Sequence, residues 1–175
     1  MRSLFKVSLR YGVLGGMIGS ILLMTLYYLG RHPFLIPVYL DFRIILFVIF
    51  ILYELKELRD YHQGGILYLW QGFIASFLFI GIYAVISTVF ILAFIAFEPD
   101  FLTEYIRLQI EQLRSIPADR IETIGKDVYE RNLQLLPVTK SGALALTYFV
   151  QSFAIGLFIS ILLSVTLRRQ PTLNN

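Results

Sequence analysis

The hydrophobic positions of this chain gather into long, nearly uninterrupted blocks rather than into the short stripes of a soluble domain. Three such blocks cover about residues 11–29, 67–97 and 143–167. A helix needs roughly 20 apolar residues to cross a hydrocarbon core of about 30 Å, and each block is about that long or longer. The pattern therefore predicts three transmembrane helices.

A shorter apolar block predicts a fourth span. Its uninterrupted run, residues 44–53, would extend only about 15 Å as a helix. We expect Pro37 to open the helix, which extends the span to residues 37–55 and places Asp41 in the first turn, where the helix dipole favours an anion. Arg43 would then snorkel toward the membrane interface.

Residues 98–140, between the third and last spans, mix acidic and basic side chains with apolar residues at helical spacing. Pro117 separates two amphipathic patterns, so we expect an extramembrane helical hairpin. Its apolar stripes suit a free hairpin or one lying on the bilayer. The predicted fold class is all-α: a polytopic membrane protein with four transmembrane helices, an amphipathic hairpin between the third and fourth, and one domain over residues 1–175.

Composition supports a membrane protein, since 57% of the residues are hydrophobic and the mean hydropathy is +0.72. The net charge of +3 excludes little by itself, but basic residues flank the first and last spans, where lipid phosphates are the nearest anions. These are Arg2, Lys6, Arg10, Arg168 and Arg169. We therefore expect a lipid bilayer as partner and no nucleic acid, and the excess of basic residues favours cytoplasmic termini.

Small residues recur four apart in two of the predicted spans. Such residues let membrane helices approach closely, because dispersion contacts rather than hydrophobic burial hold helices together in lipid. We interpret them mainly as packing faces within one bundle; an oligomer seam and a pore lining are the alternatives. The set is Gly12, Gly15, Gly16, Gly19 and Ser20, then Ser152, Gly156, Ser160 and Ser164.

Four polar residues fall within or near the spans. Gln71 and Gln151 are amides that need hydrogen-bond partners in hydrocarbon, so interhelical bonding is expected, although Gln71 also suits the interface. Asp41 and Arg43 are interpreted as dipole-matching and snorkelling residues rather than as parts of an ion pathway. The other three spans contain no ionisable residue between their flanks, which argues against ion-coupled transport.

Catalytic chemistry has few candidates in this chain. It contains no cysteine, which removes disulfides and thiolate sites. The two histidines, His32 and His62, are predicted to lie on opposite sides of the membrane. The acids Glu98, Asp100 and Glu104 suit a helix start better than a cation site. We expect no enzyme, no cofactor and no metal.

The order of these features resembles a known family. A basic amino terminus precedes a glycine-rich first span, residues 65, 68 and 71–73 open the third span with Gly, Tyr and Gln-Gly-Phe, and Glu98-Pro-Asp-Phe-Leu102 closes it. A charged insert then precedes the last span. This arrangement is similar to the domain-of-unknown-function 4199 family of small bacterial inner-membrane proteins. The resemblance implies four helices, a bacterial cytoplasmic membrane and no established activity.

We expect a non-enzymatic accessory, assembly or scaffold subunit that associates through its small-residue helix faces with itself or with another membrane protein. The hairpin would provide a docking surface on the non-cytoplasmic side. A small oligomeric transporter or channel is the alternative, because oligomerisation could create a pathway that a single chain lacks. A membrane enzyme ranks third, since no acid, base or nucleophile converges in the sequence.

Overall fold

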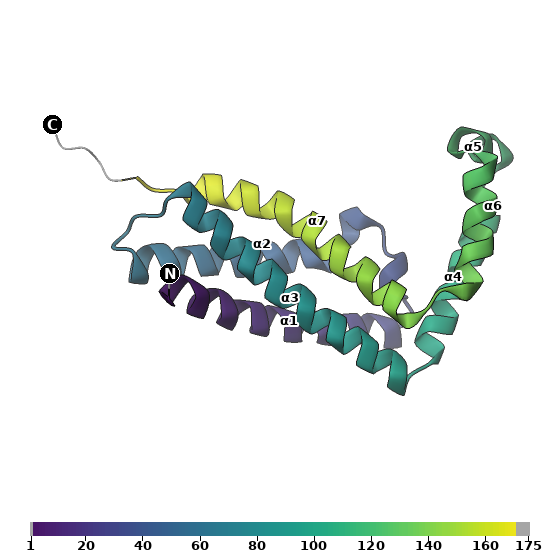
Figure 1. The fold of residues 1–175 in the computed structure, drawn as a ribbon, viewed down its shortest axis with the longest axis horizontal. Helices are drawn as coiled ribbons and strands as arrows, with labels where there is room; N and C mark the ends of the chain where they lie inside the picture. The colour runs from purple at the N-terminus through teal and green to yellow at the C-terminus, as the bar shows by residue number, and fades with distance from the viewer. Residues whose placement is uncertain (1, 171–175) are drawn as a thin grey trace.

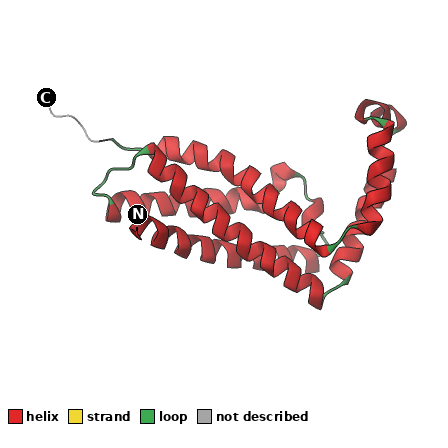
Figure 2. Cartoon of the chain, viewed as in Figure 1, coloured by secondary structure: helices red, strands yellow, loops and turns green. Residues whose placement is uncertain are grey.

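Four long helices lie side by side in the computed structural model, which describes residues 2–170. They are α1 (Arg2–Tyr28), α2 (Phe42–Glu57), α3 (Leu69–Phe97) and α7 (Ser141–Leu167) (Figure 1). Three further helices, α4 (Asp100–Arg114), α5 (Ala118–Ile124) and α6 (Lys126–Leu135), form an arm that leaves one end of the bundle (Figure 2). No strand occurs among the described residues, so the all-α prediction is confirmed.

The helices alternate in direction, and α3 packs between α1 and α7 while α2 contacts all three. At one end, Arg10 of α1 pairs with Glu57 at the close of α2, and backbone bonds of 2.9 Å join Leu67 and Arg169 in both directions. We call this the terminal end, because α1 begins and α7 finishes there. The opposite end, from which α4–α6 depart, is the arm end (Figure 1).

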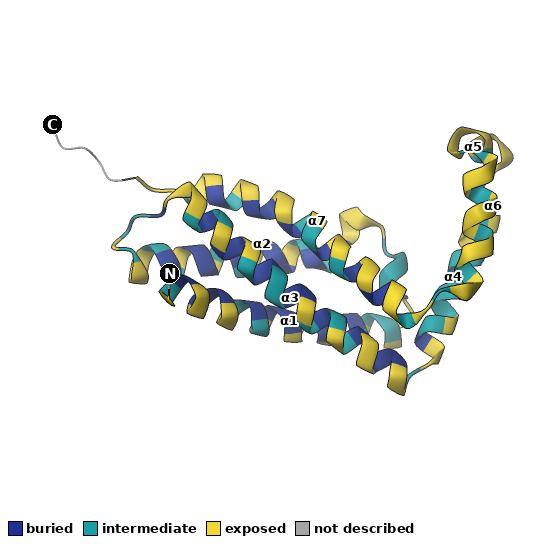
Figure 3. Ribbon diagram, in the orientation of Figure 1, coloured by how far each residue is buried: buried dark blue, intermediate teal, exposed yellow. Residues whose placement is uncertain are grey.

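The core of the bundle is aromatic and aliphatic. The Phe47 ring of α2 lies 4.7 Å from the Tyr83 ring and 5.6 Å from the Phe79 ring, centroid to centroid, and all three side chains are fully buried. The outward surfaces remain exposed and apolar: Ile45, Val89 and Phe158 are each more than 60% exposed (Figure 3). Apolar residues that face outward along whole helices are typical of contact with lipid.

The structure corrects the number of predicted spans. Three helices, α1, α3 and α7, are long and apolar enough to cross a membrane, rather than four. The predicted span over residues 37–55 is wrong at its start, because Val38–Leu40 form a separate 3-10 turn and α2 begins only at Phe42. The 16 residues of α2 reach about 24 Å, less than a hydrocarbon core of about 30 Å. A π-helical turn, Leu58–His62, then continues the helix in the bundle.

The arm also differs in detail from the predicted hairpin over residues 98–140. Its chain folds back on itself, but the second half contains two helices rather than one. Gly125 has φ = 97° between them, a backbone conformation that glycine adopts without strain. Neither α5 nor α6 contains a buried residue.

Candidate functional site

The small residues of α1 pack against α3 of the same chain. A Cβ atom added at Gly12 would lie 2.7 Å from the Ile82 Cβ, and one added at Gly16 would lie 2.9 Å from the Ile86 Cβ. Gly15 and Gly19 meet the rings of Phe79 and Tyr83 in the same way, and Ser20 is buried beside them. Side chains larger than hydrogen would therefore force α1 and α3 apart.

The small residues of α7 meet the other side of α3. A Cβ at Gly156 would lie 2.6 Å from the Ile80 Cγ1, and the Ser164 hydroxyl lies 3.1 Å from the position that a Cβ would take at Gly72. Ser152 and Ser160 are fully buried. The face on α1 is thus covered by α3, and the face on α7 is covered by α3 at Gly156 and Ser164 and by Arg43 of α2 at Ser152.

A buried ion pair lies at the start of α2, near the arm end. Arg43 is only 4% exposed, and its Nε lies 2.9 Å from each carboxylate oxygen of Asp41. Asp41 also accepts the backbone N–H of Arg43 at 2.9 Å, so it caps α2. The expected anion is therefore present at the helix start, whereas the Arg43 guanidinium points into the bundle instead of snorkelling out.

The same guanidinium connects α2 to α7. Arg43 Nη1 donates to the Ser152 hydroxyl at 3.1 Å, and Nη2 donates to the Gln151 side-chain oxygen at 3.1 Å. The Tyr148 ring lies beneath the guanidinium, with 4.2 Å between its centroid and the central carbon. The Tyr148 hydroxyl in turn lies 3.1 Å from that of Tyr83 on α3. These residues, with Asp41, form the Arg43 network, which joins three helices.

Chemically, the Arg43 network is saturated. Nε and both terminal nitrogens of the guanidinium have acceptors, and Asp41 accepts from both the side chain and the backbone of Arg43. Removing one member of a buried pair leaves an uncompensated charge, while a fully bonded network is rigid. The arrangement is suited to holding α2 and α7 in register.

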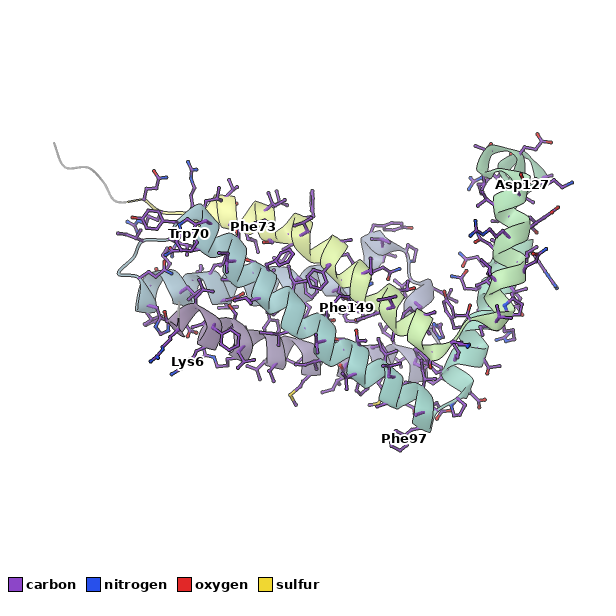
Figure 4. The ribbon with its side chains drawn as sticks, in the orientation of Figure 1. Lys6, Trp70, Phe73, Phe97, Asp127 and Phe149 are labelled. Atoms are coloured by element: carbon purple, nitrogen blue, oxygen red, sulfur yellow. The ribbon has the colours of Figure 1, made fainter. Side chains whose placement is uncertain are left out.

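Gln71, the fourth polar residue singled out in the sequence, lies apart from this network at the terminal end. Its side-chain oxygen accepts the Tyr68 backbone N–H at 3.1 Å, which satisfies a free amide at the start of α3. Figure 4 shows the neighbouring Trp70 and Phe73 at this end of the bundle, with Phe97 at the opposite end of α3.

A second buried polar site was not predicted from the sequence. Glu54 of α2 and Ser8 of α1 are both fully buried, and the Ser8 hydroxyl lies 2.5 Å from Glu54 Oε1. The only signal was periodicity: Glu54 shares a helix face with the buried Phe47 and Ile51, which lie seven and three positions earlier in the sequence.

The arm joins the bundle through a cluster of rings. The Phe101 ring, fully buried at the start of α4, lies 5.0 Å from Tyr27 and 5.2 Å from Phe94, and the His32 imidazole lies 4.6 Å from it. His32 Nε2 donates to the Phe101 carbonyl oxygen at 3.1 Å, since a carbonyl can only accept. Burial lowers the pKa of His32 below its ordinary value, which favours the neutral ring at neutral pH.

The acids and histidines singled out in the sequence do not form a metal-ligand cluster. Among residues 2–170 no three His, Asp or Glu side chains are grouped as metal ligands, and Glu98, Asp100 and Glu104 do not form such a group. His32 lies at the arm end, whereas His62 lies at the terminal end, 3.7 Å from Glu57. The two histidines therefore cannot share a ligand.

The sequence matches a protein family of unknown function, DUF4199, over residues 10–169. This match covers nearly the whole chain, which therefore belongs to that family, as its resemblance suggested. No curated protein and no solved structure matches the chain significantly.

Proposed function

We propose that this DUF4199 member is a non-enzymatic accessory or assembly subunit of the bacterial cytoplasmic membrane, whose helical bundle holds the α4–α6 arm as a docking element. The single observation behind this proposal is the arm itself. It extends well beyond the bundle, and Asp127 lies at its far tip (Figure 4). A turn of a few residues would suffice to connect α3 with α7.

The burial pattern supports a role for the arm outside the bundle. Only Phe101 is buried in α4, and nothing is buried in α5 or α6, so most of the arm adds little to the stability of the bundle (Figure 3). Ile124, Val128 and Leu135 are each about half exposed. Apolar side chains left open along an extended element are typical of a surface that another molecule covers.

The junction supports the same proposal, because it fixes the direction of the arm. The ring cluster around Phe101 and the bond from His32 act together at the base of α4. An element held at a fixed base loses less conformational freedom on binding than a flexible loop would. The basic termini are expected in the cytoplasm. The arm leaves the other end of the bundle and would therefore face the opposite side of the membrane.

Site-specific photo-crosslinking in living cells tests this function. A photo-reactive amino acid replaces Val128 on the arm, and a matched variant carries it at Val150 on α7; the two positions are 50% and 57% exposed. We expect a defined foreign protein at position 128 and no protein adduct at position 150. Adducts at position 128 with lipid alone, or with a second copy alone, would contradict a role in docking a foreign subunit.

A small oligomeric transporter or channel is the second candidate. The observation that favours it is Glu54, a carboxyl group buried between helices, since ionisable groups in membrane bundles often mark ion or proton pathways. Flux of protons and small solutes through the purified chain in liposomes measures this activity. Flux that disappears in Glu54→Gln would support the transporter.

A further inference from the structure

A carboxyl group without a cationic partner lies where α1, α2 and α3 meet. Glu54 is fully buried, and its Oε2 has no hydrogen-bond partner. Among the ion pairs of residues 2–170, the acid next to it, Glu57, pairs with Arg10, whereas none includes Glu54. Buried charges in proteins are normally paired, so an unpaired carboxylate here would be exceptional.

The hydrogen bonds around Ser8 indicate which form of the carboxyl fits. The Ser8 oxygen lies 2.5 Å from Glu54 Oε1 and 3.3 Å from the Ala75 carbonyl oxygen. A serine hydroxyl has one hydrogen, and an ionised carboxylate and a carbonyl are both acceptors. With an ionised carboxylate, the single hydroxyl hydrogen would have to be shared between the two acceptors. With a protonated carboxyl, each contact has its own hydrogen: Glu54 donates to Ser8, and Ser8 donates to Ala75.

The neighbouring charges do not offer an ionised Glu54 any compensation. The charged group of α2 that acts on Glu54 is Glu57, itself an acid. On α1, Arg10 and Tyr11 bind Glu57 rather than Glu54. His62 of the π-helical turn also faces Glu57, at 3.7 Å. The whole of α3 contains no Asp, Glu, Lys, Arg or His. A neutral acid therefore suits this junction far better than a carboxylate.

We propose that Glu54 is a proton-binding site inside the bundle, occupied at neutral pH, with Ser8 and the Ala75 carbonyl as its hydrogen-bond partners. Loss of the proton leaves a negative charge with a single donor between three helices. Because such a charge is strongly disfavoured in apolar surroundings, deprotonation loosens the contact of α1 with α2 at the terminal end. The site thus binds or releases one proton as this contact closes or opens.

Infrared spectroscopy of the purified full chain in detergent, titrated from acidic to alkaline pH, tests this proposal. A protonated carboxyl gives a C=O stretching band separate from that of a carboxylate. We expect this band at neutral pH, its loss in Glu54→Gln and its retention in the matched control Glu57→Gln. A neutral-pH spectrum with no carboxyl band that depends on Glu54 would overturn the proposal.

Two further variants keep the test decisive if Glu54→Gln is not recovered from the membrane. Ser8→Ala removes the acceptor of the carboxyl hydrogen, so the band is expected to move to higher frequency; an unmoved band would overturn the assignment.

Maleimide labelling measures how often the contact of α1 with α2 opens. Because the chain has no cysteine, Leu4→Cys at a buried position on α1 reports this opening through its rate of labelling. That rate should rise more steeply with pH than in Leu4→Cys/Ser8→Ala, in which an ionised Glu54 lacks its hydrogen-bond donor and the proton is held to higher pH; equal slopes would contradict the coupled opening.

Discussion

The close contact of α7 with α3 at Gly156 gives a sharp test of how the bundle helices pack. In Gly156→Ala, the new methyl group on α7 would lie 2.6 Å from Ile80 Cγ1, 2.7 Å from its Cδ1 and 3.0 Å from its Cγ2. Carbon atoms pack best at about 3.5–4.0 Å, so the helices must separate by several tenths of an ångström or more. Ile80 is fully buried and branched, which leaves it little room to rotate.

The expected destabilisation follows from two opposing effects. Overpacking of a close contact costs about 1–3 kcal/mol, whereas alanine favours a helix over glycine by up to about 1 kcal/mol. A matched variant separates the two: a Cβ at Gly81 on α3 would meet only Phe153 Cζ, at an ordinary 3.8 Å. Gly81→Ala carries the same propensity gain without the clash, so Gly156→Ala should be the less stable variant by about 1–3 kcal/mol.

Unfolding in mixed micelles, followed by fluorescence, measures this difference. The chain has a single tryptophan, Trp70, which borders a hollow with Ile161 and Val165 of α7, so its emission reports whether α3 and α7 remain in contact. Adding Ile80→Ala removes all three clashing atoms. The double variant should therefore recover about 0.5–3 kcal/mol relative to the sum of the single changes. Equal stability of Gly156→Ala and Gly81→Ala, or additive effects, would refute this packing.

The remaining predictions concern the polar contacts at the arm end. Asp41→Ala leaves the Arg43 charge buried and should destabilise the bundle by about 3–5 kcal/mol, whereas Glu111→Ala breaks an exposed pair and should cost about 0.3–0.5 kcal/mol; unfolding midpoints compare them. For His32, burial lowers the folded-state pKa, so the unfolded state binds more protons as pH falls below about 6.5 and stability decreases there. In His32→Phe the decrease in stability at acidic pH should be smaller. An unchanged dependence of stability on pH would contradict the role of the imidazole.

Apolar block length predicted the bundle helices that are long enough to span a membrane. Helices α3 and α7 each lie within two residues of their predicted bounds, since a run of apolar residues longer than the bilayer leaves few alternatives. Helix α1 begins nine residues early, at Arg2, because a basic stretch forms helix as readily as an apolar one. The start of α2 was missed because Pro37 opens a 3-10 turn rather than the helix itself.

The polar contacts were predictable only in part. The position of Asp41 at a helix start was predictable from local sequence. The backbone N–H that its carboxylate caps belongs to Arg43, only two residues further along the chain. The bond from Arg43 to Gln151 joins residues 108 positions apart, and no local pattern specifies which faces of two distant helices meet. Glu54 was missed for a related reason, because its contact with Ser8 joins residues 46 positions apart on different helices.

The ionisable residues of α2 explain why this short helix lies in the bundle. Its buried residues include Arg43 and Glu54, while the buried residues of α1, α3 and α7 include no Asp, Glu, Lys, Arg or His. Facing inward, both residues find hydrogen-bond partners on neighbouring helices, and outward positions such as Ile45 and Ile49 stay apolar. One end of α2 is fixed by the saturated Arg43 network and the other carries an acid with an unpartnered oxygen. If the helix moves, it should therefore move at Glu54, the end away from the arm.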